Sequence, residues 1–157
     1  MTTIGQFISL LVGDAQRELQ SSAMYYAHAS MFTGTFCYFA DTAKEHGDDE
    51  VKHFNSVCDL INLLGGISPA IQLPPPIVFG NEEMLQLELD GERTARTRYT
   101  ERYEQACELR LYGVAKVLAD ILADEDSHDN EISNVLELKS ELPIPESELS
   151  TTEIENA

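Results

Sequence analysis

The sequence predicts an all-α protein, an antiparallel four-helix bundle in which one long crossover joins the second and third helices. Apolar residues recur at alternating steps of three and four along four long stretches, which is the spacing of one helix face. All six prolines lie within residues 69–76 and 143–145, so the rest of the chain lacks the strongest helix breaker. No alternating strand pattern and no repeat of about 20–50 residues competes with this fold class.

The first helix is expected over residues 3–32 and the second over residues 36–64, with a break at Thr33-Gly34-Thr35. Gly65-Gly66 is expected to end the second helix as a C-cap. The inward line of the first helix comprises Ile4, Ile8, Leu11, Ala15, Ser22, Tyr25 and Ala29. The inward line of the second comprises Phe36, Phe39, Ala43, Val57, Ile61 and Leu64.

The crossover is expected over residues 65–80, and the third helix from Asn81 to about residue 106. Asn81 is a predicted N-cap, followed by two glutamates in the first turn, where the helix dipole favours acids. The fourth helix is expected over residues 109–142, with Leu111, Val114, Leu118, Ile121, Ile132 and Val135 in line. Residues 1–142 are therefore predicted to form the bundle, and residues 143–157 an acidic, proline-containing C-terminal tail.

The formal net charge of −18, from 10 basic and 28 acidic residues, excludes several partners. Such a chain repels phosphate backbones and anionic bilayers, so neither nucleic acid nor a membrane is expected as a partner. Residues 1–6 contain no base, so no secretory signal is expected and the predicted localisation is cytoplasmic. Cys37, Cys58 and Cys107 are widely spaced and are expected to be free, buried thiols.

Each predicted helix carries one glutamate at a position where its inward line predicts an apolar residue. These glutamates are Glu18, Glu50, Glu92 and Glu125. His53 and His128 follow two of them by three residues and therefore share their helix face. Burying four carboxylates without a counter-charge costs several kcal/mol each. Because no Lys or Arg lies on these lines, we expect metal ions to compensate the charge.

Four carboxylates and two imidazoles form a suitable ligand set for two divalent or trivalent ions. Carboxylate oxygens bind hard cations and bridge them, and imidazoles suit iron, manganese, cobalt or zinc. A single Glu-x-x-His pair is common on a solvated helix face. Two such pairs on inward lines, with one inward glutamate on each remaining helix, are typical of ferritin-like di-iron or di-manganese carboxylate proteins.

The sequence resembles the bacterioferritins, which are ferritin-like di-iron proteins, over about residues 4–142. The resemblance is carried by the segments RELQSSAMYYAHASMF, DDEVKH, NEEML with ERTARTRY, and ILADEDSHDNEI. It implies two irons per subunit, bridged by Glu50 and Glu125. The remaining ligands complete the two iron sites in pairs: Glu18 with His53, and Glu92 with His128. Glu88 superficially matches a family segment too, but only Glu92 lies on the inward line.

Further residues are interpreted through the same resemblance. Tyr25, on the line of Glu18, is expected to be either a redox-active or ligand-orienting tyrosine or a core tyrosine. Val51 replaces the Met that ligates haem in the family, so haem binding is not expected. His46 and Asp49 are expected to form either an iron site on the cavity face or part of a solvated face.

The resemblance implies an iron-storage ferroxidase that oxidises Fe²⁺ with O₂ or H₂O₂ and deposits the mineral inside a hollow homo-oligomer. A 24-mer cage is favoured over a 12-mer, although the tail departs from the short fifth helix of the family. Two alternatives remain open. One is a non-storage di-metal enzyme, a peroxidase or oxygenase, on the same bundle. The other is a dodecameric miniferritin that acts in oxidative-stress protection.

Overall fold

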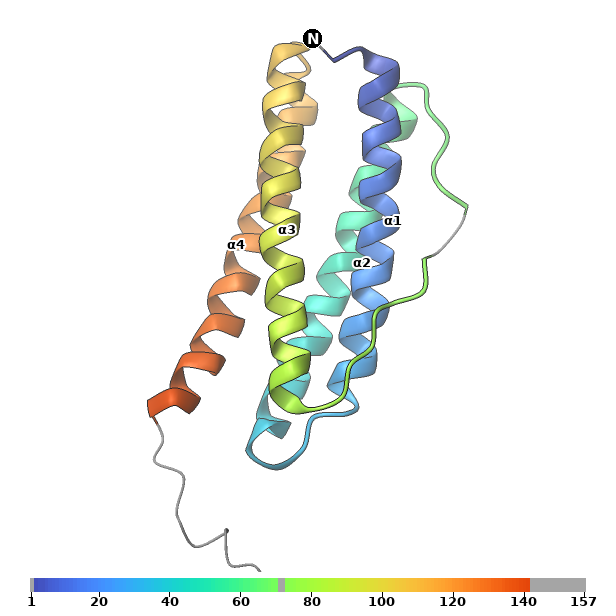
Figure 1. The fold of residues 1–157 in the computed structure, drawn as a ribbon. Helices are drawn as coiled ribbons and strands as arrows, with labels where there is room; N and C mark the ends of the chain where they lie inside the picture. The colour runs from blue at the N-terminus through green and yellow to red at the C-terminus, as the bar shows by residue number, and fades with distance from the viewer. Residues whose placement is uncertain (1, 71–72, 142–157) are drawn as a thin grey trace, which may run out of the picture.

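The computed structural model describes residues 2–70 and 73–141, and it confirms the predicted fold class (Figure 1). The helices are α1 (Ile4–Ala29), the short 3-10 helix η1 (Gly34–Phe39), α2 (Ala40–Leu63), α3 (Asn81–Glu108) and α4 (Tyr112–Glu141). None of the described residues belongs to a strand. No helix in this part of the chain is both long enough and apolar enough to cross a bilayer. The predicted tail, residues 143–157, lies outside the described residues.

The bundle consists of two antiparallel hairpins, α1 with α2 and α3 with α4 (Figure 1). The crossover runs back along α1 from the end of α2 to the opposite end of the bundle, so α2 and α3 point the same way (Figure 1). Gln20 of α1 holds it there by donating a hydrogen bond to the carbonyl oxygen of Pro74 at 2.6 Å.

The helix ends differ from the prediction at identifiable points. Thr3 is an N-cap rather than a helical residue, because its Oγ1 accepts from the backbone N–H of Gln6 while Gln6 Oε1 accepts from that of Thr3. The first helix ends at Ala29, and residues 34–39 adopt a 3-10 rather than an α conformation. The predicted end of α2 is confirmed, with Gly65 at φ 83° and the Gly66 N–H donating to the carbonyl of Ile61.

The predicted N-cap of the third helix is wrong. Gly80, at φ 101°, precedes the helix, and Asn81 is its first residue. The Asn81 side chain reaches Thr33 instead. Its Oδ1 accepts from the Thr33 N–H at 3.0 Å, and its Nδ2 donates to the Thr33 carbonyl at 3.2 Å. Asn81 therefore ties the start of α3 to the turn that follows α1.

Two predictions of burial are also wrong. Ile4 is 47% exposed, and Phe7, one turn further along α1, is fully buried in its place. The cysteines are free, as predicted, but Cys37 is exposed and the other two are only half-buried.

The core consists of two apolar clusters at successive levels of the bundle. One contains Phe7, Leu11, Val57, Ala106, Leu118 and Ile121, with further neighbours. The other contains Met24, Ala43, Met84, Leu85, Ile132 and Val135, with further neighbours. On every helix the inward glutamate falls between residues of the two clusters, so the packing places the four glutamates at one level and shields them from water on both sides.

Candidate metal centre

Six side chains from all four helices meet in the middle of the bundle. They are Glu18, Glu50, His53, Glu92, Glu125 and His128, each at most 3% exposed. They form two groups, in each of which one ligand atom per residue lies within 4.8 Å of all the others. The first group is Glu18, Glu50, His53 and Glu125, and the second is Glu50, Glu92, Glu125 and His128. Glu50 and Glu125 belong to both groups, which is the division that the resemblance implies.

Several ligand atoms of this cluster are buried without a hydrogen-bond partner. They are the Nδ1 atoms of both histidines, both carboxylate oxygens of Glu125, and Glu92 Oε2. His53 Nδ1 lies 3.4 Å from Glu125 Oε1, and His128 Nδ1 lies 3.6 Å from Glu92 Oε2. Unpaired polar atoms are costly to bury. Because all of these face one place and are good ligands for hard or borderline cations, the residues present fit a pair of metal ions.

Each histidine is held from its other side by an aspartate of the opposite helix. His53 Nε2 lies 3.1 Å from Asp124 Oδ2, and His128 Nε2 lies 3.4 Å from Asp49 Oδ2. A carboxylate at this distance accepts a hydrogen bond from the Nε2–H, which leaves Nδ1 as the atom that faces a cation. Each aspartate directly precedes a glutamate of the centre, so the segment Asp-Glu-x-x-His occurs once on α2 and once on α4.

Two buried tyrosines orient the glutamates of α1 and α3 crosswise. Tyr25 of α1 donates a hydrogen bond to Glu92 Oε1, and Tyr99 of α3 donates to Glu18 Oε1 at 2.7 Å. Burial, and then the neighbouring carboxylates, raise the pKa of both tyrosines well above the usual value, so both keep the proton that they donate. Tyr25 thus contacts the glutamate of the other hairpin, not Glu18 on its own helix.

The two glutamates shared by both groups hold protons more firmly than usual. Burial, and then the charge of Glu18, raise the pKa of Glu50 to about 8. Burial and the charge of Glu50 raise the pKa of Glu125 well above its usual value. At Glu18, the interaction with His53, whose Nδ1 lies 3.6 Å from Glu18 Oε2, outweighs the opposing effect of burial and lowers the pKa to about 2.

The histidines carry the complementary protons. Burial disfavours their charged form, but the surrounding carboxylates outweigh it and raise the pKa of His53, and raise that of His128 to about 10. At Glu92, favourable interactions with the neighbouring Glu125 and His128 side chains lower the pKa despite burial. Without metal, the centre therefore balances its charge with protons, which cations must displace.

His46 supports the centre from one side. Its ring stacks on that of His128 with centroids 4.0 Å apart, and its Nε2 lies 3.2 Å from Glu131 Oε2. His46 is 2% exposed, so the alternative that placed it on a solvated face is wrong. Asp49 is half-buried between His128 and Lys52.

Sequence reasoning missed two buried pairs of polar side chains next to the centre. His28 Nδ1 lies 2.9 Å from Glu88 Oε1, and both side chains are fully buried. Asp14, also fully buried, accepts a hydrogen bond from Arg102 Nε at 2.7 Å. Glu88 therefore lies beside the centre and outside both ligand groups, whereas Glu92 lies in one. The only sequence feature that could have indicated their burial was spacing, because Glu88 lies one turn before Glu92 and Asp14 one turn before Glu18.

Comparisons with known proteins agree with this fold and cluster. The family model of the ferritin-like domain matches residues 8–141. A bacterioferritin of Brucella melitensis biotype 1 is 26% identical over 128 residues, which are 80% of this chain and 79% of that protein.

Two solved structures share the fold. A ferritin-like, diiron-carboxylate protein of Bacillus anthracis str. Ames has a TM-score of 0.81 and 27% identity, over 87% of this chain and 99% of that chain. A dodecameric thioferritin of Bacteroides fragilis, described as bacterioferritin-related, has a TM-score of 0.81 and 20% identity, over 88% of each chain. The family model spans most of the sequence, and the four-helix fold agrees with it: the chain belongs to the ferritin-like domain family.

Proposed function

We propose that the protein is an iron-storage ferroxidase of the bacterioferritin type. The observation that carries this proposal is the layer of unpaired, buried ligand atoms between two apolar clusters. Such a layer destabilises a bundle unless cations bind there. The ligand set suits several metals, and the similarity to a bacterioferritin and to a diiron-carboxylate protein supports iron.

Iron is the substrate in this proposal, and the protein supplies its binding site. Glu50 and Glu125, common to both groups, would hold both Fe²⁺ ions. Glu18 with His53, and Glu92 with His128, complete the two positions. Bound Fe²⁺ supplies the electrons that reduce O₂ or H₂O₂, and the product Fe³⁺ passes into a mineral inside a hollow homo-oligomer.

The tyrosines prepare the terminal carboxylates for this role. Tyr25 occupies Glu92 Oε1 and leaves Oε2, which has no hydrogen-bond partner, facing His128. Tyr99 occupies Glu18 Oε1 in the same way. Both carboxylates are therefore oriented before a cation arrives, which lowers the entropic cost of binding. We assign Tyr25 to ligand orientation on this basis.

The assembly and the absence of haem are part of the proposal. The sequence resemblance favours a 24-mer cage, whereas the similar thioferritin of Bacteroides fragilis is dodecameric. That similarity favours, as second candidate, a dodecameric miniferritin acting in oxidative-stress protection. Val51, half-buried on α2, offers no atom to a haem iron, so we propose a non-haem protein. We also propose a cytoplasmic location.

Substitution of the shared carboxylates tests the ferroxidase function. In E50Q, E125Q and the double variant, we expect Fe²⁺ oxidation in air, followed by Fe³⁺ absorbance, to fall to the rate without protein. The matched control is E88Q, which changes another fully buried glutamate outside both ligand groups and should retain the parent rate. Unchanged oxidation in the double variant would contradict the proposal.

Particle size and iron content test storage separately. After aerobic loading with Fe²⁺, size exclusion with light scattering and metal analysis should find a large particle with far more iron than two ions per chain. A particle near the subunit mass of 17.5 kDa, with two metals or none per chain, would rule out storage. With two metals per chain, it would favour the non-storage di-metal enzyme.

A further inference from the structure

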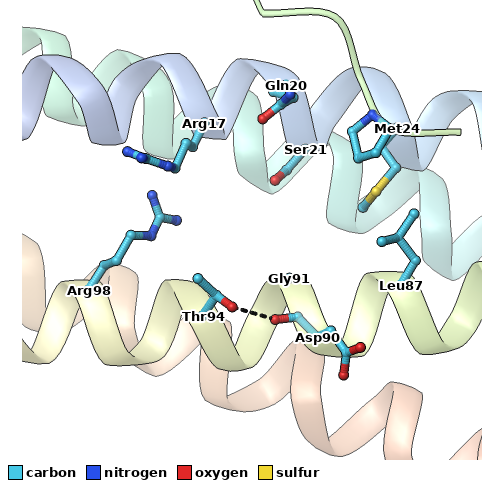
Figure 2. A pocket seen from close by; sticks show the side chains of 10 residues that line it. Arg17, Gln20, Ser21, Met24, Leu87, Asp90, Gly91, Thr94 and Arg98 are labelled. Carbon is cyan, nitrogen blue, oxygen red and sulfur yellow. Dashed lines mark hydrogen bonds between the residues drawn. The ribbon is translucent and has the colours of Figure 1, made fainter.

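A cavity of about 280 Å³ opens at the surface between α1 and α3 (Figure 2). Its walls are side chains of these two helices, together with Pro76 of the crossover. None of the six residues of the metal centre lines it. Glu18 and Glu92 lie on the buried side of the same two helices, so the cavity is a separate space next to the centre.

Two guanidinium groups face each other at one end of this cavity. Arg17 of α1 and Arg98 of α3 point toward one another across the gap (Figure 2). Their Nη1 atoms lie 3.9 and 3.3 Å from the same atom, Asp14 Oδ1. Both guanidiniums are therefore near enough for one small ligand to contact both.

Several guanidinium groups share one buried carboxylate at this end. The buried Asp14 carboxylate is shared among Arg17, Arg98 and Arg102. Arg98 Nη2 also lies 3.6 Å from Glu18 Oε1, but that oxygen already accepts a hydrogen bond from Tyr99. Arg102 Nη1 also lies 3.6 Å from Glu101 Oε2, and Arg102 does not line the cavity. The two arginines that do line it, Arg17 and Arg98, share the Asp14 carboxylate between them.

The arginines retain donors that the protein does not satisfy. Arg17 Nη1 donates to the Gly13 carbonyl at 3.1 Å, but half of this side chain is exposed. Arg98 Nη1 donates to Asp14 Oδ1, whereas Arg98 Nε is buried and has no hydrogen-bond partner. Asp90, which also lines the cavity, directs its carboxylate away from the gap and accepts from Gln86 at 2.9 Å (Figure 2). No lining carboxylate therefore opposes an anion at the arginine end.

We propose that this cavity binds a tetrahedral oxoanion, such as inorganic phosphate, between Arg17 and Arg98. The planar fork of a guanidinium matches the spacing of phosphate oxygens, and charge-assisted hydrogen bonds of this kind are among the strongest in proteins. Ser21 adds a hydroxyl group to the lining, whereas the Thr94 hydroxyl donates to the Asp90 carbonyl at 2.8 Å (Figure 2). Gly91 leaves room, because a Cβ atom built there meets nothing within 4 Å.

Calorimetric titration of the metal-free, full-length protein with inorganic phosphate at constant ionic strength tests the site. We expect saturable binding at a single site per chain, weakened about tenfold or more in R17Q and in R98Q. The control is R93Q, which removes the same charge from an exposed arginine of α3 that pairs with Asp129 and lies outside this cavity. Its phosphate affinity should equal that of the parent protein.

A second pair of variants tests the cavity while keeping both arginines. G91L fills the open space with an apolar side chain and should abolish phosphate binding, whereas G91A adds one methyl group and should retain it. Absence of saturable binding in the parent protein would overturn the proposal. So would equal weakening in R93Q, or full affinity in G91L.

Discussion

His46 contacts the metal centre through the face of its ring. It stacks on His128 on one side, meets Tyr25 edge-on at a centroid distance of 5.3 Å, and is anchored by Glu131. A ring fixed in this way limits the rotation of His128, whose Nδ1 must face the cation. Residues that orient a ligand in this manner typically change metal affinity about 10–100-fold when they are removed.

We therefore expect H46A to bind Co²⁺ about tenfold more weakly at the position completed by His128. H46F keeps a ring for stacking and should restore most of the affinity, although it loses the contact with Glu131. The Co²⁺ absorption spectrum in the visible range reports both affinity and ligand geometry. Equal spectra and affinities in H46A and the parent protein would show that the stacking has no role.

Metal binding should depend steeply on pH. The raised pKa values of Glu50, about 8, and of His128, about 10, mean that protons occupy these groups at neutral pH. Glu125 and His53 are raised as well, so cations displace a proton from each of these four residues. Because more than one proton leaves per cation, affinity should rise by more than about tenfold per pH unit.

Zn²⁺ titrations between pH 6 and 7.5, repeated in two buffers that differ in ionisation enthalpy, measure this proton release directly. Zn²⁺ binding should weaken as the pH falls, because a larger fraction of the ligand carboxylates and imidazoles is then protonated. A pH-independent affinity would mean that the carboxylates and imidazoles already lack their protons in the metal-free protein.

The cluster residues were predictable because each interrupts an apolar line whose period is set by the helix itself. The crosswise bonds from Tyr25 to Glu92 and from Tyr99 to Glu18 were not, since they depend on the two hairpins lying side by side. The buried pair of His28 with Glu88 was missed for the same reason, because neither residue has a partner on its own helix.

At the level of elements, the turn after α1 and the start of α3 form one unit through Asn81. This single side chain accepts from the Thr33 N–H and donates to the Thr33 carbonyl, which also accepts from the Phe36 N–H at 3.2 Å. Sequence periodicity located each helix but misplaced several ends, including the start of α2, where residues 34–39 wind as a 3-10 helix. A cap or a turn depends on contacts between distant segments, which helical periodicity does not encode.

Asn81→Ala should lower the free energy of unfolding by about 1–3 kcal/mol, because it leaves the Thr33 N–H without its partner and removes one of the two hydrogen bonds that the Thr33 carbonyl accepts. Asn55→Ala on the exposed side of α2 removes the same amide without a described contact and should change stability by less than about 0.5 kcal/mol. Urea unfolding followed by circular dichroism measures both. A similar change in the two variants would remove the structural role assigned to Asn81.

In the molecule as a whole, the metal centre is the place where the two apolar clusters of the core meet. Cations that bind there act on all four helices at once, and they bind only the folded chain. Metal binding at this central position should therefore stabilise the whole bundle, whereas a site at the end of the bundle would contact fewer helices and stabilise it less.

We expect redox-inert Zn²⁺ at about 100 times its Kd to stabilise the folded protein by about 2.7 kcal/mol. E125Q should melt near the parent temperature without metal, since a glutamine resembles the protonated carboxyl that burial favours there. It should lose the metal-dependent increase in Tm. Thermal melts of both proteins, with and without Zn²⁺, make the comparison, and an equal increase in E125Q would place the stabilising cation elsewhere.

The ion pair between Arg98 and Glu18, at 3.6 Å, makes the two halves of the ligand set unequal. Among the described residues, no arginine or lysine lies within 4.0 Å of a Glu92 oxygen. A cation beside Glu18 therefore meets a repulsion that its neighbour beside Glu92 does not. The centre should fill in order, first at Glu92 and His128 and then at Glu18 and His53, as two resolved steps in calorimetry that merge in R98Q. The two halves of the ligand set are otherwise alike, so the single charge of Arg98 determines the order in which the two positions bind a cation.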